Sequence, residues 1–367
     1  MSFLEFKCFK GMIILTKING QAAPIKEYYI AYFDLLGYKD FFKTKPDQVE
    51  EFLEYMYLAI HNMGIYKQEI SSSFIAGEIA QIQIKSKVFS DNILLCLEAG
   101  ETTNEIARLL AFMAIVADIQ LNFILRYGLF LRGGITKGTL SFNEEFVFGQ
   151  GLIDVVEMEE GAKYPRIIIS QNIVDCMKKL HFINQDDLNK ICEIEKRIKA
   201  GENITDEELN FCNSLLPAYL QDCFVVYCRD NLICSVADDV DVLNYFYYFD
   251  VKNFFDKQTM DKIMESIKEV SPADYDRLQV PAMNLQEKLE QHKVCVIEKL
   301  KEYGNYVGMA IKGQTSIKER ENILKKYLWV TYFHNLICEK NNLPDYKIYS
   351  SANCDPKVMA LTVQVQE

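Results

Sequence analysis

Size, composition and charge restrict the function classes open to this chain of 367 residues. Hydrophobic residues make up 49% of it and aromatic residues 12%, which supports packed cores and argues against intrinsic disorder. The net charge of −12 argues against a DNA or RNA partner, because lysine and arginine contacts dominate binding to nucleic-acid backbone. The length exceeds one typical domain, so we expect a core domain and an appended one.

The cysteines and the apolar segments point to a compartment. The eleven cysteines are scattered without a Cys-x-x-Cys pair, which favours reduced thiols over a disulfide framework or a zinc site. No uninterrupted run of about 20 apolar residues occurs, and residues 1–26 lack the apolar core of a signal peptide. We therefore predict a cytoplasmic protein with no membrane partner and treat residues 1–26 as an N-terminal extension.

An apolar, aromatic run over residues 27–34 predicts a central strand that ends in Asp34. A carboxylate inside such a run is costly unless a partner neutralises it, and a divalent cation is one such partner. Alternatively, Asp34 caps the following helix by accepting hydrogen bonds from its free amides. The pattern alone leaves both interpretations open.

A helix is expected at residues 47–65, and residues 80–97 then alternate as two strands joined at residues 90–92. Asp91 lies at that join, where Ser-Asp-Asn is an ordinary turn sequence. Considered together with Asp34, Asp91 is also a candidate metal ligand. Mg²⁺ takes one or two protein carboxylates and fills its other positions with phosphates and water. Two aspartates at adjacent strand ends therefore suit a nucleoside triphosphate bound with Mg²⁺ or Mn²⁺.

The next elements complete a sheet packed on helices. A helix is expected at residues 102–123, followed by a strand at residues 126–138 and a short strand at residues 145–148. An acidic helix opened by Gly149 and Gly151 then leads to an apolar strand at residues 166–169. The alternation of strand, helix, two strands, helix and strand predicts an α+β fold of ferredoxin-like type.

Four motifs fall in a fixed order with no large gap: Phe33-Asp34-Leu35-Leu36-Gly37, Ser90-Asp91, Arg132-Gly133-Gly134-Ile135-Thr136-Lys137-Gly138 and Phe148-Gly149-Gln150-Gly151-Leu152. Through them, residues 27–172 resemble the class III nucleotidyl cyclase catalytic domain. The resemblance implies a palm-type nucleotidyl cyclase sandwich in a divergent, bacterial stand-alone member. It also implies a homodimer, because cyclases of this class place their active sites at head-to-tail subunit interfaces.

The resemblance assigns roles to particular residues. It implies that Asp34 and Asp91 bind the metal ions. Backbone amides after Asp34 would face phosphate at a helix N-terminus, at Leu35, Leu36, Gly37 and Tyr38. Lys87 matches the lysine that marks adenine specificity, whereas Phe146 replaces the polar partner that reads the base.

The chain departs from the family where the transition state is stabilised. The family's Asn falls on Ile153 and its Arg on Glu157, and neither replacement can donate a hydrogen bond to a developing phosphate charge. The chain is then a cyclase that stabilises its transition state differently, with Arg132 or Lys137 as candidates, or a nucleotidyltransferase that joins two nucleotides. A third interpretation is a nucleotide sensor or protein-interaction module, and a fourth is a structural scaffold.

Residues 173–367 are predicted to form a mostly helical C-terminal domain. Thr205 is expected to cap a helix, residues 223–235 to form two short strands about a turn at residues 229–231, and residues 284–303 and 316–338 to form long helices. His334 is expected to hydrogen-bond inside this helical bundle.

The sequence therefore predicts a metal-dependent nucleotidyl cyclase that makes a cyclic nucleotide signal from a nucleoside triphosphate. Stand-alone members of this kind can serve in signalling, including bacterial antiviral signalling. The alternative is a catalytically degenerate nucleotide sensor or protein-interaction module.

Overall fold

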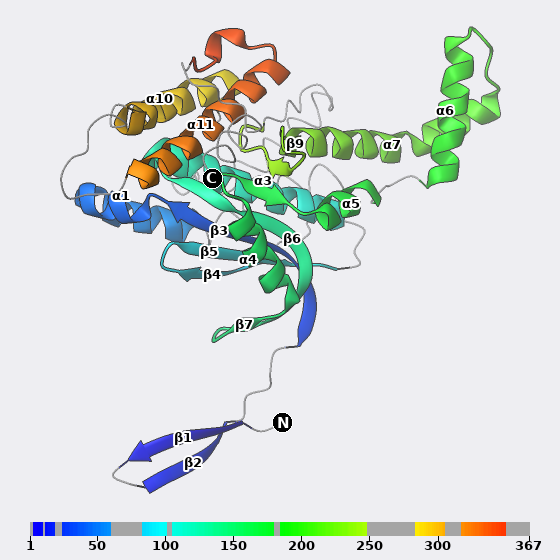
Figure 1. Cartoon of the computed structure of the whole chain (residues 1–367). Helices are drawn as coiled ribbons and strands as arrows, with labels where there is room; N and C mark the ends of the chain where they lie inside the picture. The colour runs from blue at the N-terminus through cyan, green and yellow to red at the C-terminus, as the bar shows by residue number, and fades with distance from the viewer. Residues whose placement is uncertain are drawn as a thin grey trace.

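An eight-stranded mixed sheet is the frame of the fold (Figure 1). The computed structural model describes residues 3–9, 12–18, 24–59, 83–100, 105–179, 184–247, 283–304 and 317–349, and the sheet is counted over these. Its strands are β3 (Ile25–Leu36), β4 (Ile84–Phe89), β5 (Asn92–Glu98), β6 (Phe130–Phe142), β7 (Val147–Phe148), β8 (Ile167–Ile169), β9 (Ile233–Ser235) and β10 (Asp241–Leu243). Strands β1 (Phe3–Phe9) and β2 (Met12–Ile18) pair with each other in a separate sheet.

Strand β3 is central, because it has a neighbouring strand on each side and both of its faces are buried. It pairs antiparallel with β5 on one side and with β6 on the other. Phe33 belongs to the large core on one face, and Ile30 belongs to a smaller buried cluster on the opposite face. Burial on both faces explains why this strand is a nearly continuous apolar run.

The strand order β4-β5-β3-β6, with antiparallel neighbours throughout, is the arrangement that a βαββαβ unit produces. Residues 49–59 are helical, as are α1 (Tyr38–Thr44) and α3 (Glu105–Tyr127). The predicted α+β class is confirmed. Strand β6 starts at Phe130, later than predicted, because α3 continues to Tyr127.

Helix α4 (Gln150–Gly161) covers the face of the sheet opposite to α3 (Figure 1). Two glycines allow a close approach between α4 and β6. A Cβ atom added to Gly138 would lie 2.6 Å from the Cα of Gly151, closer than packed atoms tolerate. Because neither glycine has a side chain, α4 can pack closely on β6 at this crossing.

The sheet and its core continue past residue 172, where we predicted a domain boundary. Strand β8 runs parallel to β6, and β10 extends the sheet by pairing with β8. The helices that follow β8 are α5 (Gln171–Lys179), α6 (Gln185–Lys199), α7 (Asp206–Leu232), α10 (Leu285–Gly304) and α11 (Ile317–Lys340). Residues of α7, α10 and α11 share one buried cluster with the sheet. The C-terminal helices are therefore packed on the region of residues 27–172.

The prediction of two strands within residues 223–235 is wrong for the first of them. Helix α7 runs through the expected turn and ends only at Leu232, so the strand pair is β9 with β10. Short apolar runs fit a strand and a buried helix equally well, which explains the error. The capping prediction is confirmed, because Thr205 and Glu208 form a reciprocal capping box at the start of α7.

Helix α3 is a long, apolar helix. Of the helices in the described residues, it alone is long and apolar enough to cross a membrane, over residues 108–127. Most of this stretch is buried in the structure, and Leu109, Phe112 and Val116 are part of the large core. Burial against the sheet thus accounts for its hydropathy.

Two buried histidines join α10 to α11. The Nδ1 atoms of His292 and His334 lie 3.2 Å apart, and both side chains are fully buried. The Nε2 atom of His334 lies 2.9 Å from the Tyr346 carbonyl oxygen, so this nitrogen carries the proton. His292 then donates through Nδ1 and accepts from the Tyr245 hydroxyl at 3.1 Å. Both imidazoles are neutral, and the predicted hydrogen-bonding role of His334 is confirmed.

This histidine pair should make the fold sensitive to acid. Burial lowers the pKa of His334 to about 4, and burial beside His334 lowers the pKa of His292 well below its ordinary value. The unfolded chain therefore binds protons first, and stability should be lost as pH falls below about 6.5, by up to about 1.4 kcal/mol per pH unit for each histidine.

Urea unfolding at about pH 7, 6 and 5 measures this loss. The His292→Gln, His334→Gln double variant keeps hydrogen-bonding groups that do not titrate, so its stability should depend less on pH. An equal pH dependence in both proteins would contradict the assignment.

Candidate functional site

Asp34 and Asp91 lie next to each other at one end of the sheet. Asp34 is near the end of β3, opposite Asn92, the first residue of β5, and Asp91 is in the turn immediately before it. The Leu35 amide donates to the Asp91 carbonyl at 2.9 Å, which fixes the turn against the end of β3. The structure therefore brings together two aspartates that are 57 positions apart in the sequence.

Arg132 holds Asp34 from the neighbouring strand. Its guanidinium lies 3.3 Å from the Asp34 carboxylate, and its Nε donates to Glu159 of α4 at 2.7 Å. A second guanidinium nitrogen also forms an ion pair with Glu159. Only 24% of the Arg132 side chain is exposed, compared with 19% for Asp34 and 9% for Glu159. One cation thus compensates two largely buried carboxylates.

The surroundings of Asp34 disfavour its charged form. Burial raises the pKa of Asp34, Arg132 opposes this, and the carboxylates of Glu159 and Asp91 add to the increase. Lys326 of α11 also acts on Asp34 and lowers its pKa. A further cation between Asp34 and Asp91 would relieve the repulsion between them.

These carboxylates fit Mg²⁺ or Mn²⁺, since both ions accept hard oxygen ligands. Within the part of the chain that the structure describes, no three His, Cys, Asp or Glu side chains form a metal cluster. Two carboxylates suffice when phosphate and water complete the octahedron. The donor set therefore suits an ion that arrives with a phosphate-bearing ligand.

The segment after Asp34 decides between the two interpretations of that residue. The N-cap of α1 is Gly37, in the left-handed conformation with φ of 89°, and no side chain caps the helix. The interpretation of Asp34 as a helix cap is therefore wrong. The predicted phosphate amides differ in availability, because Leu35 already donates to Asp91 whereas Tyr38 begins α1 without an intrahelical acceptor.

The two candidate base-reading residues lie near the β6–β7 turn. The Lys87 ammonium donates to the Glu144 carbonyl in that turn and lies 5.9 Å from the centre of the Phe142 ring. Phe146 lies two residues after Glu144 and packs against Phe148, with ring centres 5.6 Å apart. The structure thus brings Lys87 and the segment that carries Phe146 together.

Helix α4 contributes a residue to the site that sequence reasoning missed. Ile153 is 53% exposed and Glu157 is also exposed, whereas Glu159 is buried against Arg132. The buried positions Gly151, Val155 and Glu159 are each four residues apart, on one face of α4. A carboxylate in such a buried row was a usable signal for an internal partner.

Lys137 is not part of this site. It lies opposite Tyr29 on β3 and pairs with Glu27, with 3.2 Å between the ammonium and the carboxylate. Of the two cations considered for charge stabilisation, only Arg132 is at the aspartates.

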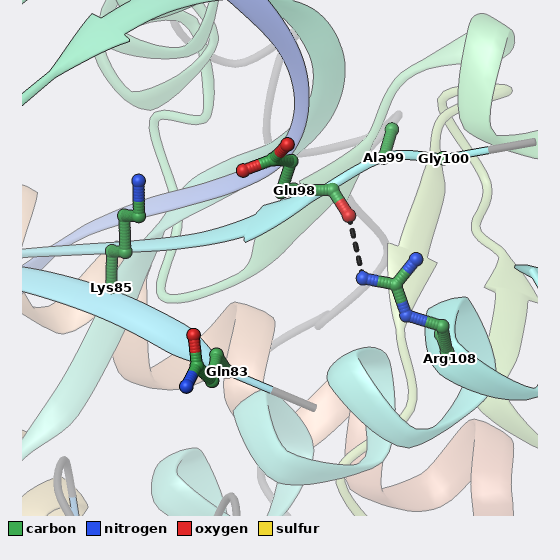
Figure 2. Close-up of a pocket in the computed structure, with 6 residues that line it drawn as sticks. All are labelled: Gln83, Lys85, Glu98, Ala99, Gly100 and Arg108. Atoms are coloured by element: carbon green, nitrogen blue, oxygen red, sulfur yellow. Dashed lines mark hydrogen bonds between the residues drawn. The ribbon is translucent and has the colours of Figure 1, made fainter. Parts of the chain in front are cut away.

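A pocket of about 300 Å³ lies at the opposite end of β5 (Figure 2). It is lined by Gln83, Lys85, Glu98, Ala99, Gly100 and Arg108. Figure 2 shows Arg108 donating to the backbone carbonyl of Glu98, at 2.7 Å, and this arginine also pairs with Glu105. Lys85 donates to the Tyr28 hydroxyl. Because these cations are engaged and Glu98 is at the far end of β5 from Asp91, the pocket is separate from the aspartate site.

No family model and no curated protein matches the chain. Among solved structures, the adenylyl cyclase CyaB from P. aeruginosa is 12% identical, with a TM-score of 0.32 over 44% of this chain and 84% of that one. A class III adenylyl cyclase-like ATP-binding protein from Pseudomonas aeruginosa is 11% identical, with a TM-score of 0.25 over 41% of this chain and 34% of that one. Both TM-scores are below 0.5, so the chain's own residues have to indicate its function.

Removing the Arg132 cation should destabilise the fold. The Arg132→Met variant leaves Asp34 and Glu159 without their shared partner, and we expect a loss of about 2 kcal/mol, below the cost for a fully buried pair. Arg229→Met is a matched control, since Arg229 is 26% exposed but pairs with a largely exposed Asp230. It should cost less than about 1 kcal/mol. Urea unfolding compares the two, and equal losses would contradict the role given to Arg132.

Proposed function

We propose that this chain is a metal-dependent nucleotidyl cyclase with the ferredoxin-like, palm-type sandwich of that class. It converts a nucleoside triphosphate into a cyclic nucleotide signal and pyrophosphate in the cytoplasm, for use in bacterial antiviral signalling. The observation that carries the proposal is the juxtaposition of Asp34 and Asp91 at adjacent strand ends, beside a carboxylate-bound Arg132. Such a pair suits the Mg²⁺ or Mn²⁺ that accompanies a triphosphate.

The reaction joins the ribose hydroxyl oxygen to the α-phosphorus, releases the hydroxyl proton to solvent, and breaks the bond from that phosphorus to the pyrophosphate oxygen. Asp34 and Asp91 would hold the metal ions, which would lower the pKa of the attacking hydroxyl and neutralise charge on the leaving pyrophosphate. The amide of Tyr38 and the backbone at Gly37 would hold phosphate at the start of α1.

Arg132 has two carboxylate partners, and this matters when Asp34 turns toward a metal ion. Glu159 would keep the guanidinium in place after Asp34 has left it, because Glu159 contacts two of its nitrogens. Arg132 would then be free on one side to stabilise negative charge on the phosphates. Lys87 and Phe146 are assigned to the base.

A homodimer accounts for the surface of α4. Phe148 just before the helix is 68% exposed, and Ile153 on its first turns is 53% exposed. Two large apolar side chains near each other in sequence suit a contact with a second subunit.

The alternative is a nucleotide sensor or protein-interaction module. Ile153 and Glu157 favour this alternative, because both side chains are exposed and neither can donate a hydrogen bond to phosphate. A sensor would bind nucleotide at Asp34 and Asp91 without turnover.

Incubation of the full chain with each of the four ribonucleoside triphosphates and Mg²⁺ or Mn²⁺ should release pyrophosphate, and mass analysis should show a cyclic product. Asp34→Asn and Asp91→Asn should each reduce the rate at least about 100-fold, because each removes a metal ligand. A linear or cyclic dinucleotide product would instead identify a nucleotidyltransferase.

Asp239→Asn is the control, since Asp239 has a positive φ of 59°, which asparagine tolerates, and belongs to the β9–β10 turn. This variant should keep full activity. Metal-dependent binding without any product would favour the sensor, and nucleotide affinity that is unchanged in Asp34→Asn and Asp91→Asn would sink both interpretations.

A further inference from the structure

Helix α11 packs against the part of the fold that holds the aspartates. Tyr327 contacts Phe130 edge to face, with ring centres 5.4 Å apart, and Phe130 begins β6 two residues before Arg132. Trp329 stacks on Tyr164, just beyond the end of α4, at 5.9 Å. In Figure 1, α11 lies beside α10 at this end of the sheet. The C-terminal helix is thus anchored on β6, which carries Arg132, and on the segment just after α4, the helix that carries Glu159.

Lys326 precedes Tyr327 on α11 and is partly buried. Among the described residues, no carboxylate lies within ion-pairing distance of its ammonium, although Asp34 and Glu159 attract it and Arg132 repels it. Burial, with a further contribution from Arg132, lowers the pKa of Lys326. A partly buried lysine without a direct partner costs free energy, because its charge has lost solvent without gaining a hydrogen-bonded anion.

Packing does not require a charge at this position. The next four residues of α11, Tyr327 to Val330, are all buried and anchor the helix in the core. An uncharged side chain at position 326 would avoid the cost of desolvation. An anion bound in direct contact with the ammonium would offset that cost.

A bound triphosphate would supply that anion. Arg132 is the only direct cationic partner, among the described residues, of the carboxylates of Asp34 and Glu159, and it is shared between them. A triphosphate brought by metal ions to Asp34 and Asp91 adds further negative charge at the same place. Lysine is a common phosphate ligand because its ammonium is a compact charge on a flexible stem.

We propose that Lys326 binds a phosphate group of the nucleoside triphosphate held at Asp34 and Asp91, so that the C-terminal helix α11 completes the active site. This inference rests on the proposed function, because it takes the triphosphate as the ligand of the aspartates. It adds a ligand-binding residue that lies more than 150 positions beyond the nucleotidyl cyclase-like region.

The test is calorimetric titration of the full chain with the four 3′-deoxyribonucleoside triphosphates in Mn²⁺. These probes lack the attacking hydroxyl and are not turned over. Lys326→Met should weaken binding of the preferred triphosphate about 10-fold or more, as expected for loss of a charge-assisted hydrogen bond. Binding of the nucleoside of the same base should change less than about two-fold, because it carries no phosphate.

Two variants and a melting curve complete the design. Lys326→Arg should restore most of the affinity, and Lys325→Met is the control, since Lys325 is turned about 100° away on α11. Lys326→Met should melt no lower than the native chain, because it removes a desolvated charge and keeps the length of the side chain.

The outcomes separate the two claims. If the native chain binds a triphosphate in a metal-dependent way and Lys326→Met binds it equally well, the inference is overturned and the proposed function stands. The same holds if Lys325→Met weakens binding as much as Lys326→Met. If the native chain binds none of the four triphosphates, the proposed function fails and the inference fails with it.

Discussion

The ion pairs of Arg132 with Asp34 and Glu159 connect the three elements on which the site depends. Asp34 comes from β3, Arg132 from β6 and Glu159 from α4, and all three side chains are more than three-quarters buried. Without the guanidinium, two carboxylates would lie close together in a poorly solvated place. The close glycine contact of α4 with β6 brings Glu159 within reach, so backbone packing and charge compensation act together.

The charge balance of this region favours a bound cation and a bound anion. Asp34, Asp91 and Glu159 bring three carboxylates, whereas Arg132 is the only cation in direct contact with them among the described residues. Burial raises the pKa of Asp34, and Lys326 lies nearby without a direct partner. A fold selected for stability alone would pair or remove such charges. Uncompensated charges at one place are typical of a site that its ligand completes.

The strands in residues 27–34, 80–97, 126–138 and 166–169 were predictable from sequence, because apolar runs with turn residues between them define strands. The pairing of Asp34 with Asp91 was predicted from the resemblance to the class III nucleotidyl cyclase domain. Glu159 was missed although it belongs to the buried row of α4, since that row becomes visible only when the helical register is known. Lys326 gave no signal, because only the packing of Tyr327 and Trp329 brings α11 to the site. The end of α7 was misassigned because its apolar run has no clear period.

A crystal structure of the full chain with Mn²⁺ and a 3′-deoxyribonucleoside triphosphate tests the central claim most directly, because anomalous scattering locates the metal. The account predicts manganese bound by carboxylate oxygens of both Asp34 and Asp91, at about 2.2 Å, with triphosphate oxygens completing the coordination. Manganese bound elsewhere, or a triphosphate bound away from both aspartates, would contradict it.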